Sequence, residues 1–224
     1  MVTSAVNHYF RSSIGRKQLV AITGLLLCGF LVSHLTGNLL LMVSSDAFNL
    51  YAHKLASLGG LLYVIEAALA FIFVLHLGLA IKLNLENYKS RGKYQVKKKT
   101  GRGTTFASQT MPYTGLVLLV FMILHLKSLK FGTHYDTTID GVVMRDLTRT
   151  TIEYFSSVSA VIWYVFAMTT TALHTSHGFA SAFQSMGWNH GKYFKNVKRL
   201  GYIYAVVVSG GFAFLAIYCH MKGA

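Results

Sequence analysis

Five of the ten histidines in this 224-residue chain lie inside long apolar stretches. An ionisable side chain within a membrane is costly and usually serves a function. A neutral histidine can also act as polar glue between helices, but four successive stretches that each carry a histidine favour a shared ligand. Imidazole nitrogen is a common ligand of iron, so these side chains are candidates for binding haem. The five residues are His34, His76, His125, His174 and His177.

The apolar stretches predict five transmembrane helices. Hydrophobic residues make up 53% of the chain and charged residues 12%, about half of the usual charged share of roughly 25%. About 20 helical residues cross a bilayer core, and the third stretch reaches that length only if Lys127 and Lys130 extend toward the membrane surface. We therefore expect one all-α integral membrane domain over residues 1–224. The predicted spans are 19–43, 58–81, 113–131, 156–180 and 200–219.

The first stretch resembles a signal peptide because basic residues precede it. It is too long for the apolar core of such a peptide, and no small-residue cleavage site follows it. We expect it to be retained as a helix.

The net charge of +14 is concentrated in particular segments. Fifteen of the 21 basic residues precede the first span or lie between spans two and three or four and five, whereas the loop between spans three and four is balanced. The positive-inside rule then predicts an inner (cytoplasmic) membrane protein with its N-terminus in the cytoplasm and its C-terminus outside. Topology thus explains the charge without nucleic acid, and the basic face also suits an acidic protein surface or anionic lipid. These residues are Arg11, Arg16, Lys17, Lys82, Lys89, Arg91, Lys93, Lys97, Lys98, Lys99, Arg102, Lys192, Lys195, Lys198 and Arg199.

Several redox cofactors are excluded by the residues present. The two cysteines, Cys28 and Cys219, cannot supply the four thiolates of an iron–sulfur cluster, and no C-x-x-C-H motif attaches a c-type haem. No glycine-rich loop follows a strand pattern, so a dinucleotide fold is not indicated. Redox chemistry here requires a non-covalent cofactor and a partner that exchanges electrons with it.

Counting 1.5 Å per residue along a helix sorts the histidines by depth. On the outward-running first and third spans, His34 and His125 lie roughly 25 Å and roughly 20 Å from the inner ends. On the inward-running second and fourth spans, His76 and His174 lie roughly 9 Å and roughly 15 Å from the inner edge. An outer pair, His34 with His125, and an inner pair, His76 with His174, are what two stacked bis-histidine haems require. A metal transporter tends instead to gather its ligands, with carboxylates, at one level.

The combined motifs resemble those of the cytochrome b subunit of succinate dehydrogenase/fumarate reductase, in its single-subunit, five-helix, two-haem form. The resemblance covers nearly the whole chain. The residues that carry it are Ser13-x-x-Arg16-Lys17, Thr23-Gly24, His34-Leu35-x-Gly37-Asn38, Phe48-Asn49-x-Tyr51-x-His53, Leu61-Leu62-Tyr63-x-x-Glu66, His76, Asn87-x-x-x-Arg91-x-x-Tyr94, His174-x-Ser176-x-Gly178 and Gly187-Trp188.

The resemblance implies a bundle of the first four helices around two stacked b haems. Its axial ligands pair the first helix with the third and the second with the fourth, as the depths do. The family motif favours His174 over His177, one turn further on, which remains the alternative. The chain would not itself act on succinate or fumarate. A flavoprotein subunit and an iron–sulfur subunit on the cytoplasmic face would exchange electrons, through the haems, with a quinone, menaquinone in the two-haem type.

Further site residues have two interpretations each. Ser13, Arg16 and Lys17 would bind the propionates of the inner haem or serve as positive flanking charge. Glu66 would handle protons at an outer quinone site or be a protonated structural acid. His53 would line the same outer pocket or lie at the membrane interface.

One position departs from the family. Some members carry a glutamate two residues before the ligand of the fourth helix, where this chain has Ala172, so a proton path through that position is not expected. Two other classes remain open: the di-haem cytochrome b of a hydrogenase or formate dehydrogenase, and a non-redox transporter or anchor. The direction of electron flow is not fixed by these residues.

Overall fold

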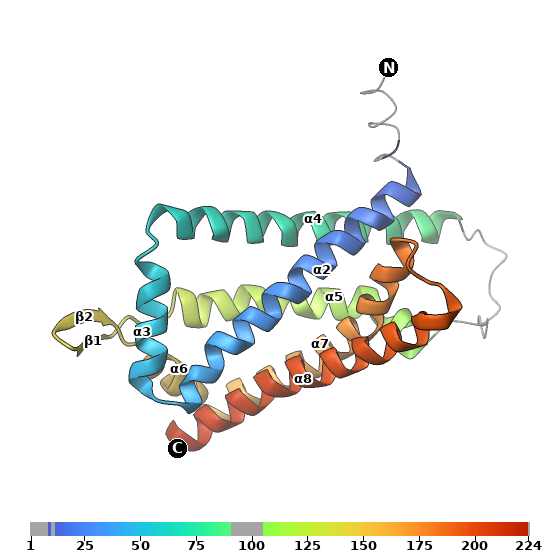
Figure 1. The fold of residues 1–224 in the computed structure, drawn as a ribbon. Coiled ribbons are helices and arrows are strands. Elements are labelled where there is room, and N and C mark those ends of the chain that lie inside the picture. The colour runs from blue at the N-terminus through green and yellow to red at the C-terminus, as the bar shows by residue number, and fades with distance from the viewer. Residues whose placement is uncertain (1–8, 10–11, 91–104, 224) are drawn as a thin grey trace.

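Helices dominate the computed structural model, which describes residues 9, 12–90 and 105–223 (Figure 1). About 85% of it is helical. Among the described residues, five helices, two of them with their short continuations, are long and apolar enough to cross a membrane. This agrees with the prediction of an all-α membrane protein with five spans. The five helices are α2 (Ser13–Asn38), α4 (Gly60–Ser90), α5 (Phe106–His125), α7 (Val158–Ser185) and α8 (Gly191–Gly223).

Two helices, α2 and α5, begin before the predicted apolar runs, and polar residues cap their N-terminal ends. The Ser12 hydroxyl accepts the Gly15 amide hydrogen at 3.1 Å at the start of α2, and Thr105 and Ser108 form a reciprocal capping box before α5. The third span, predicted from residue 113, therefore begins at Phe106, and α5 alone has 20 residues. It does not need the lysine turn to reach membrane-spanning length. That turn is a π-helix, η2 (Leu126–Lys130), and a 3₁₀ turn, η1 (Leu39–Met42), continues α2.

Contacts between helices fix their directions. The Tyr204 hydroxyl of α8 donates to the Cys28 carbonyl of α2 at 2.9 Å, and seven residues further along both helices a Cβ at Gly211 would meet Leu35. α8 therefore runs parallel to α2. Figure 1 shows the start of α2, the end of α4 and the connection between α7 and α8 at one end of the bundle. We call it the basic end because, among the described residues, Lys17, Lys89 and Lys192 lie there.

The opposite end carries short elements that were not predicted from the sequence. They are α3 (Ser45–Ala56), the antiparallel strands β1 (Asp136–Ile139) and β2 (Val142–Arg145), and α6 (Leu147–Phe155). Asp140 and Gly141 turn the hairpin with positive φ angles of 52° and 78°. We call this the capped end; it also holds the C-terminus (Figure 1). Ser156 and Ser157, assigned to the fourth span from sequence, instead lie between α6 and α7.

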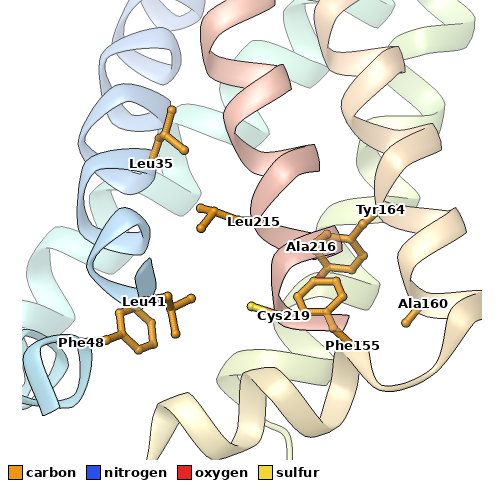
Figure 2. Close-up of a cluster of buried hydrophobic side chains, with 9 residues drawn as sticks. All are labelled: Leu35, Leu41, Phe48, Phe155, Ala160, Tyr164, Leu215, Ala216 and Cys219. Carbon is orange, nitrogen blue, oxygen red and sulfur yellow. The ribbon is translucent and has the colours of Figure 1, made fainter. Parts of the chain in front are cut away.

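The main cluster of buried apolar side chains joins the capped end to the long helices (Figure 2). Phe48 of α3 and Phe155 of α6 are each 4% exposed. Beneath them Tyr164 of α7 packs edge-to-face on Phe155, with ring centroids 4.7 Å apart. The cluster consists of Leu35, Leu41, Phe48, Phe155, Ala160, Tyr164, Leu215, Ala216 and Cys219.

Candidate functional site

Two histidines from α2 and α5 face each other toward the capped end. The ring centroids of His34 and His125 are 5.9 Å apart, and the ring planes are almost perpendicular at 88°. Bonds from a metal ion to imidazole nitrogen are about 2 Å long, judged from zinc sites. Two such bonds on opposite sides of one ion place the ring centroids roughly 6 Å apart or slightly more, so the observed separation is near that of two ligands of one ion.

Aromatic side chains surround this outer pair. His34 stacks on Phe30 of the same helix at 5.3 Å between centroids and lies 5.4 Å from the ring of Phe212 of α8. On the other side, His125 Nδ1 lies 3.0 Å from the hydroxyl of the buried Tyr164 of α7. Four helices thus surround the pair, mainly with aromatic rings, and the Tyr164 hydroxyl lies against His125.

His76 of α4 and His174 of α7 are the residues of the predicted inner pair. The Nδ1 atom of His76 lies 3.0 Å from Oγ1 of Thr23 in α2, and the Nδ1 atom of His174 lies 3.0 Å from Oγ1 of Thr114 in α5. Each inner histidine is therefore held by a threonine of a neighbouring helix through the same ring nitrogen.

A glycine follows each of these threonines. A Cβ atom at Gly24 would lie 3.1 Å from Cε1 of His76, and one at Gly115 would lie 3.8 Å from Cε1 of His174. The first distance is tighter than ordinary packing allows, whereas the second is a normal contact. The His76 ring thus depends on the missing side chain at Gly24 to approach the α2 backbone.

α2 and α5 share one sequence pattern. Each has Thr-Gly followed by nine residues and a histidine, so His34 lies eleven residues after Thr23 and His125 eleven after Thr114. At 1.5 Å per residue this interval separates the inner and outer levels by roughly 16 Å on both helices. Sequence reasoning gave Thr114 no role and Thr23 none beyond a family motif. The repeated spacing was the signal that could have identified both.

The three residues predicted to bind the propionates of the inner haem, Ser13, Arg16 and Lys17, differ in burial and in contacts. Arg16 is half-buried and forms an ion pair with Glu86 of α4 at 2.6 Å, which joins α2 to α4 at the basic end. Ser13 and Lys17 are exposed. Arg11 and the predicted basic residues Arg91, Lys93, Lys97, Lys98, Lys99 and Arg102 lie outside the described residues.

Glu66, the carboxylate predicted to handle protons, forms an ion pair with Lys130 at the end of η2. The two side chains are 37% and 39% exposed. The pair joins α4 to the segment directly after His125. His53 is half-buried on α3, outside the five long helices. His177 is half-buried and lies one turn beyond His174 on α7.

Within the described residues, no group of three or more histidine, cysteine, aspartate or glutamate side chains could hold a metal ion. Each histidine pair therefore offers two imidazoles. Because a porphyrin supplies the in-plane nitrogens itself, two axial imidazoles complete an iron site, and the donor set fits haem. The chain matches no protein-family model, no curated protein and no solved structure.

Proposed function

We propose that this chain is the di-haem cytochrome b membrane anchor of a succinate:quinone oxidoreductase. The observation that carries the proposal is the arrangement of four histidines from four helices as two pairs at two levels. His34 and His125 would hold the haem toward the capped end, and His76 and His174 the haem toward the basic end. The sequence resemblance supports the same pairing.

Each bound haem would supply a centre that takes up and releases one electron. The chain's own contribution is to fix two imidazoles per level and to surround them with apolar helices that exclude water. The aromatic rings around His34 and the buried hydroxyl of Tyr164 tune the outer level. Electrons would pass between an iron–sulfur subunit at one end and membrane menaquinone.

The basic end is proposed as the docking face for the iron–sulfur and flavoprotein subunits, in the cytoplasm. In the described part of the chain it carries basic residues from three long helices, among them the exposed Lys17, Lys89 and Lys192. By the positive-inside rule, such segments would lie on the cytoplasmic side of the inner membrane, and the C-terminus would lie on the opposite side.

The quinone is proposed to react near the capped end, where Glu66 pairs with Lys130 beside the outer histidine level. A carboxylate at this position can accept a proton released by a quinol and pass it outward. Lys130 holds the carboxylate in place and thereby sets where that proton is received. Half-buried His53 is proposed to line the same region.

Purified protein tests the proposal through its reduced-minus-oxidised optical spectrum. We expect a b-type α-band and two haems per chain. Replacement of His76 or His174 by alanine is expected to remove one haem, and replacement of His34 or His125 to remove the other. His177→Ala is the matched control beside His174 and should retain both. A wild-type spectrum without a b-type band contradicts the proposal.

The partner distinguishes this function from that of a hydrogenase or formate dehydrogenase anchor. Complexes purified through this chain are expected to contain a flavoprotein and to reduce a menaquinone analogue with succinate. Co-purification of a hydrogenase or formate dehydrogenase subunit instead would agree with haem binding but contradict the proposed role in succinate:quinone oxidoreduction.

A further inference from the structure

Two buried threonine hydroxyl groups already donate their hydrogens within their own helices. Thr23 Oγ1 donates to the carbonyl of Leu19 in α2 at 2.7 Å, and Thr114 Oγ1 donates to the carbonyl of Met111 in α5 at 3.0 Å. The residues are 5% and 7% exposed. A hydroxyl group has one hydrogen and two lone pairs, so while that hydrogen is directed at the helix carbonyl, each oxygen accepts from a third partner.

That third partner is the Nδ1 atom of an inner histidine, at 3.0 Å in both cases. For the hydroxyl oxygen to accept, Nδ1 of His76 and of His174 must carry the hydrogen. A neutral imidazole carries one hydrogen on its two nitrogens. Nε2 is therefore left with its lone pair, which is the form that binds a metal ion.

The outer pair is arranged differently. His125 Nδ1 faces the phenol of Tyr164 at 3.0 Å, and a phenol can either donate or accept. His34 Nδ1 lies 3.4 Å from the amide nitrogen of Asn38, which donates to the His34 carbonyl at 2.8 Å. Neither neighbour holds the hydrogen of an outer ring on Nδ1, because the phenol allows either tautomer of His125 and the amide nitrogen of Asn38 can only donate to His34.

We propose that Thr23 and Thr114 are positioning residues that hold His76 and His174 in the Nδ1-protonated tautomer, so that both Nε2 atoms keep the lone pair that would bind the inner haem iron. The proposal rests on the haem-binding function proposed above and adds residues to that site. A hydrogen-bonded partner of this kind fixes the orientation of a ligating histidine and raises its basicity. A more basic ligand favours the oxidised iron and so lowers the potential of that haem.

The test uses the complete chain with both haems, carrying Thr23→Val, which removes the acceptor and keeps a branched side chain. An optical redox titration is expected to show a higher midpoint potential for the inner haem and an unchanged value for the outer haem. Transfer of the inner haem to excess apomyoglobin should become about 10- to 100-fold faster, the usual effect of losing such a partner. Thr23→Ser keeps the hydroxyl group and should restore both values.

Thr36→Val is the matched control on α2, because Thr36 is exposed and its hydroxyl bonds to the carbonyl of Val32 in its own helix at 2.9 Å. It should leave both potentials unchanged. Thr114→Val is an independent second test, with the same change expected as for Thr23→Val.

Three results would overturn the inference. They are unchanged inner-haem values in both valine variants, a serine variant that behaves like its valine counterpart, and loss of both haems from both valine variants while the serine variants keep them. The last result would mean a role in folding, since a positioning residue of one level leaves the other level intact. Absence of haem from the wild-type chain would instead contradict the proposed function itself, so the two failures are distinguishable.

Discussion

At the scale of single residues, the two histidine levels differ in what surrounds the rings. The inner rings bond to threonine hydroxyls, whereas the outer ring of His125 bonds to the phenol of Tyr164. Tyr164 also belongs to the main apolar cluster. The outer level is thus connected to the packing of the capped end, while the inner level depends on close approach between helices.

Gly24 gives a direct test of that close approach. Gly24→Leu is expected to displace the His76 ring, because even a Cβ atom there would lie 3.1 Å from Cε1. The inner haem should be lost and the outer haem retained, measured from the haem-to-protein ratio and the spectrum. Gly29→Leu is the control on the same helix, since a Cβ there has no neighbour within 4 Å. Equal haem loss from both variants would contradict a specific role for Gly24.

At the scale of elements, η2 connects the outer histidine level to the capped end. The π-helix begins directly after His125 and ends at Lys130, which pairs with Glu66 of α4. π-helical turns are frequent at functional sites because they reposition side chains within a helix. Here the turn places Lys130 beside Glu66, the carboxylate that the sequence predicted to handle protons.

Lys130→Met tests whether this pair serves quinone chemistry or stability. More than a third of each side chain is exposed, so breaking the pair should change the unfolding free energy by less than about 1 kcal/mol. Haem content should remain unchanged, while quinol-driven reduction of the haems slows, and Glu66→Gln should act in the same direction. Lys127→Met, in the same turn, is the control. A rate equal to wild type in Lys130→Met and Glu66→Gln would exclude the pair from that reaction.

Hydrogen bonds of the Asn49 side chain link α3 to the start of α6 at the capped end. Its amide donates to Asp146 Oδ1 at 3.0 Å, and its carbonyl oxygen accepts from the amide and the hydroxyl of Thr148 at 3.0 and 3.1 Å. The residue is 2% exposed, so its partners would be left unsatisfied if it were replaced.

Asn49→Leu is expected to lower the unfolding free energy by about 1–3 kcal/mol. In a chain of this size, each kcal/mol corresponds to about 2–4 °C in Tm, which thermal unfolding in detergent would measure. Lys54→Ala, at an exposed position of α3, should leave Tm nearly unchanged. A Tm for Asn49→Leu within error of the wild type would contradict this linking role.

At the scale of the whole molecule, the two ends of the bundle are built from different elements. The basic end gathers the start of α2, the end of α4 and the connection between α7 and α8, and the capped end gathers α3, the hairpin, α6 and the C-terminus (Figure 1). We expect the basic end to face the cytoplasm.

Single cysteines at the two ends test this orientation. Asp140→Cys lies at the hairpin tip and Lys192→Cys near the start of α8, both at exposed positions. A membrane-impermeant maleimide should label Asp140→Cys in intact cells and Lys192→Cys only after permeabilisation. The unaltered chain, whose Cys28 and Cys219 lie within long helices, gives the background. The reverse labelling pattern would show the opposite topology and would contradict docking of the partner subunits at the basic end.

The sequence alone predicted the five long helices and the helix that carries each histidine. These properties are local, since the length of an apolar run and the 1.5 Å rise per residue determine the span and the depth of any residue on it. The capped end was missed because its helices and strands are short and not apolar enough to stand out in a search for membrane-spanning runs. Their side chains are buried only against the ends of other elements.

The partners of the site residues were decided by the tertiary structure. The bond between Thr23 and His76, and the ion pairs of Arg16 with Glu86 and Glu66 with Lys130, join residues more than fifty positions apart in the chain. Hydropathy and spacing give the depth of each residue but not the rotation of its helix about its own axis. That rotation is set by how neighbouring helices pack, and it determined that a threonine hydroxyl faces each inner imidazole and that Lys130 faces Glu66.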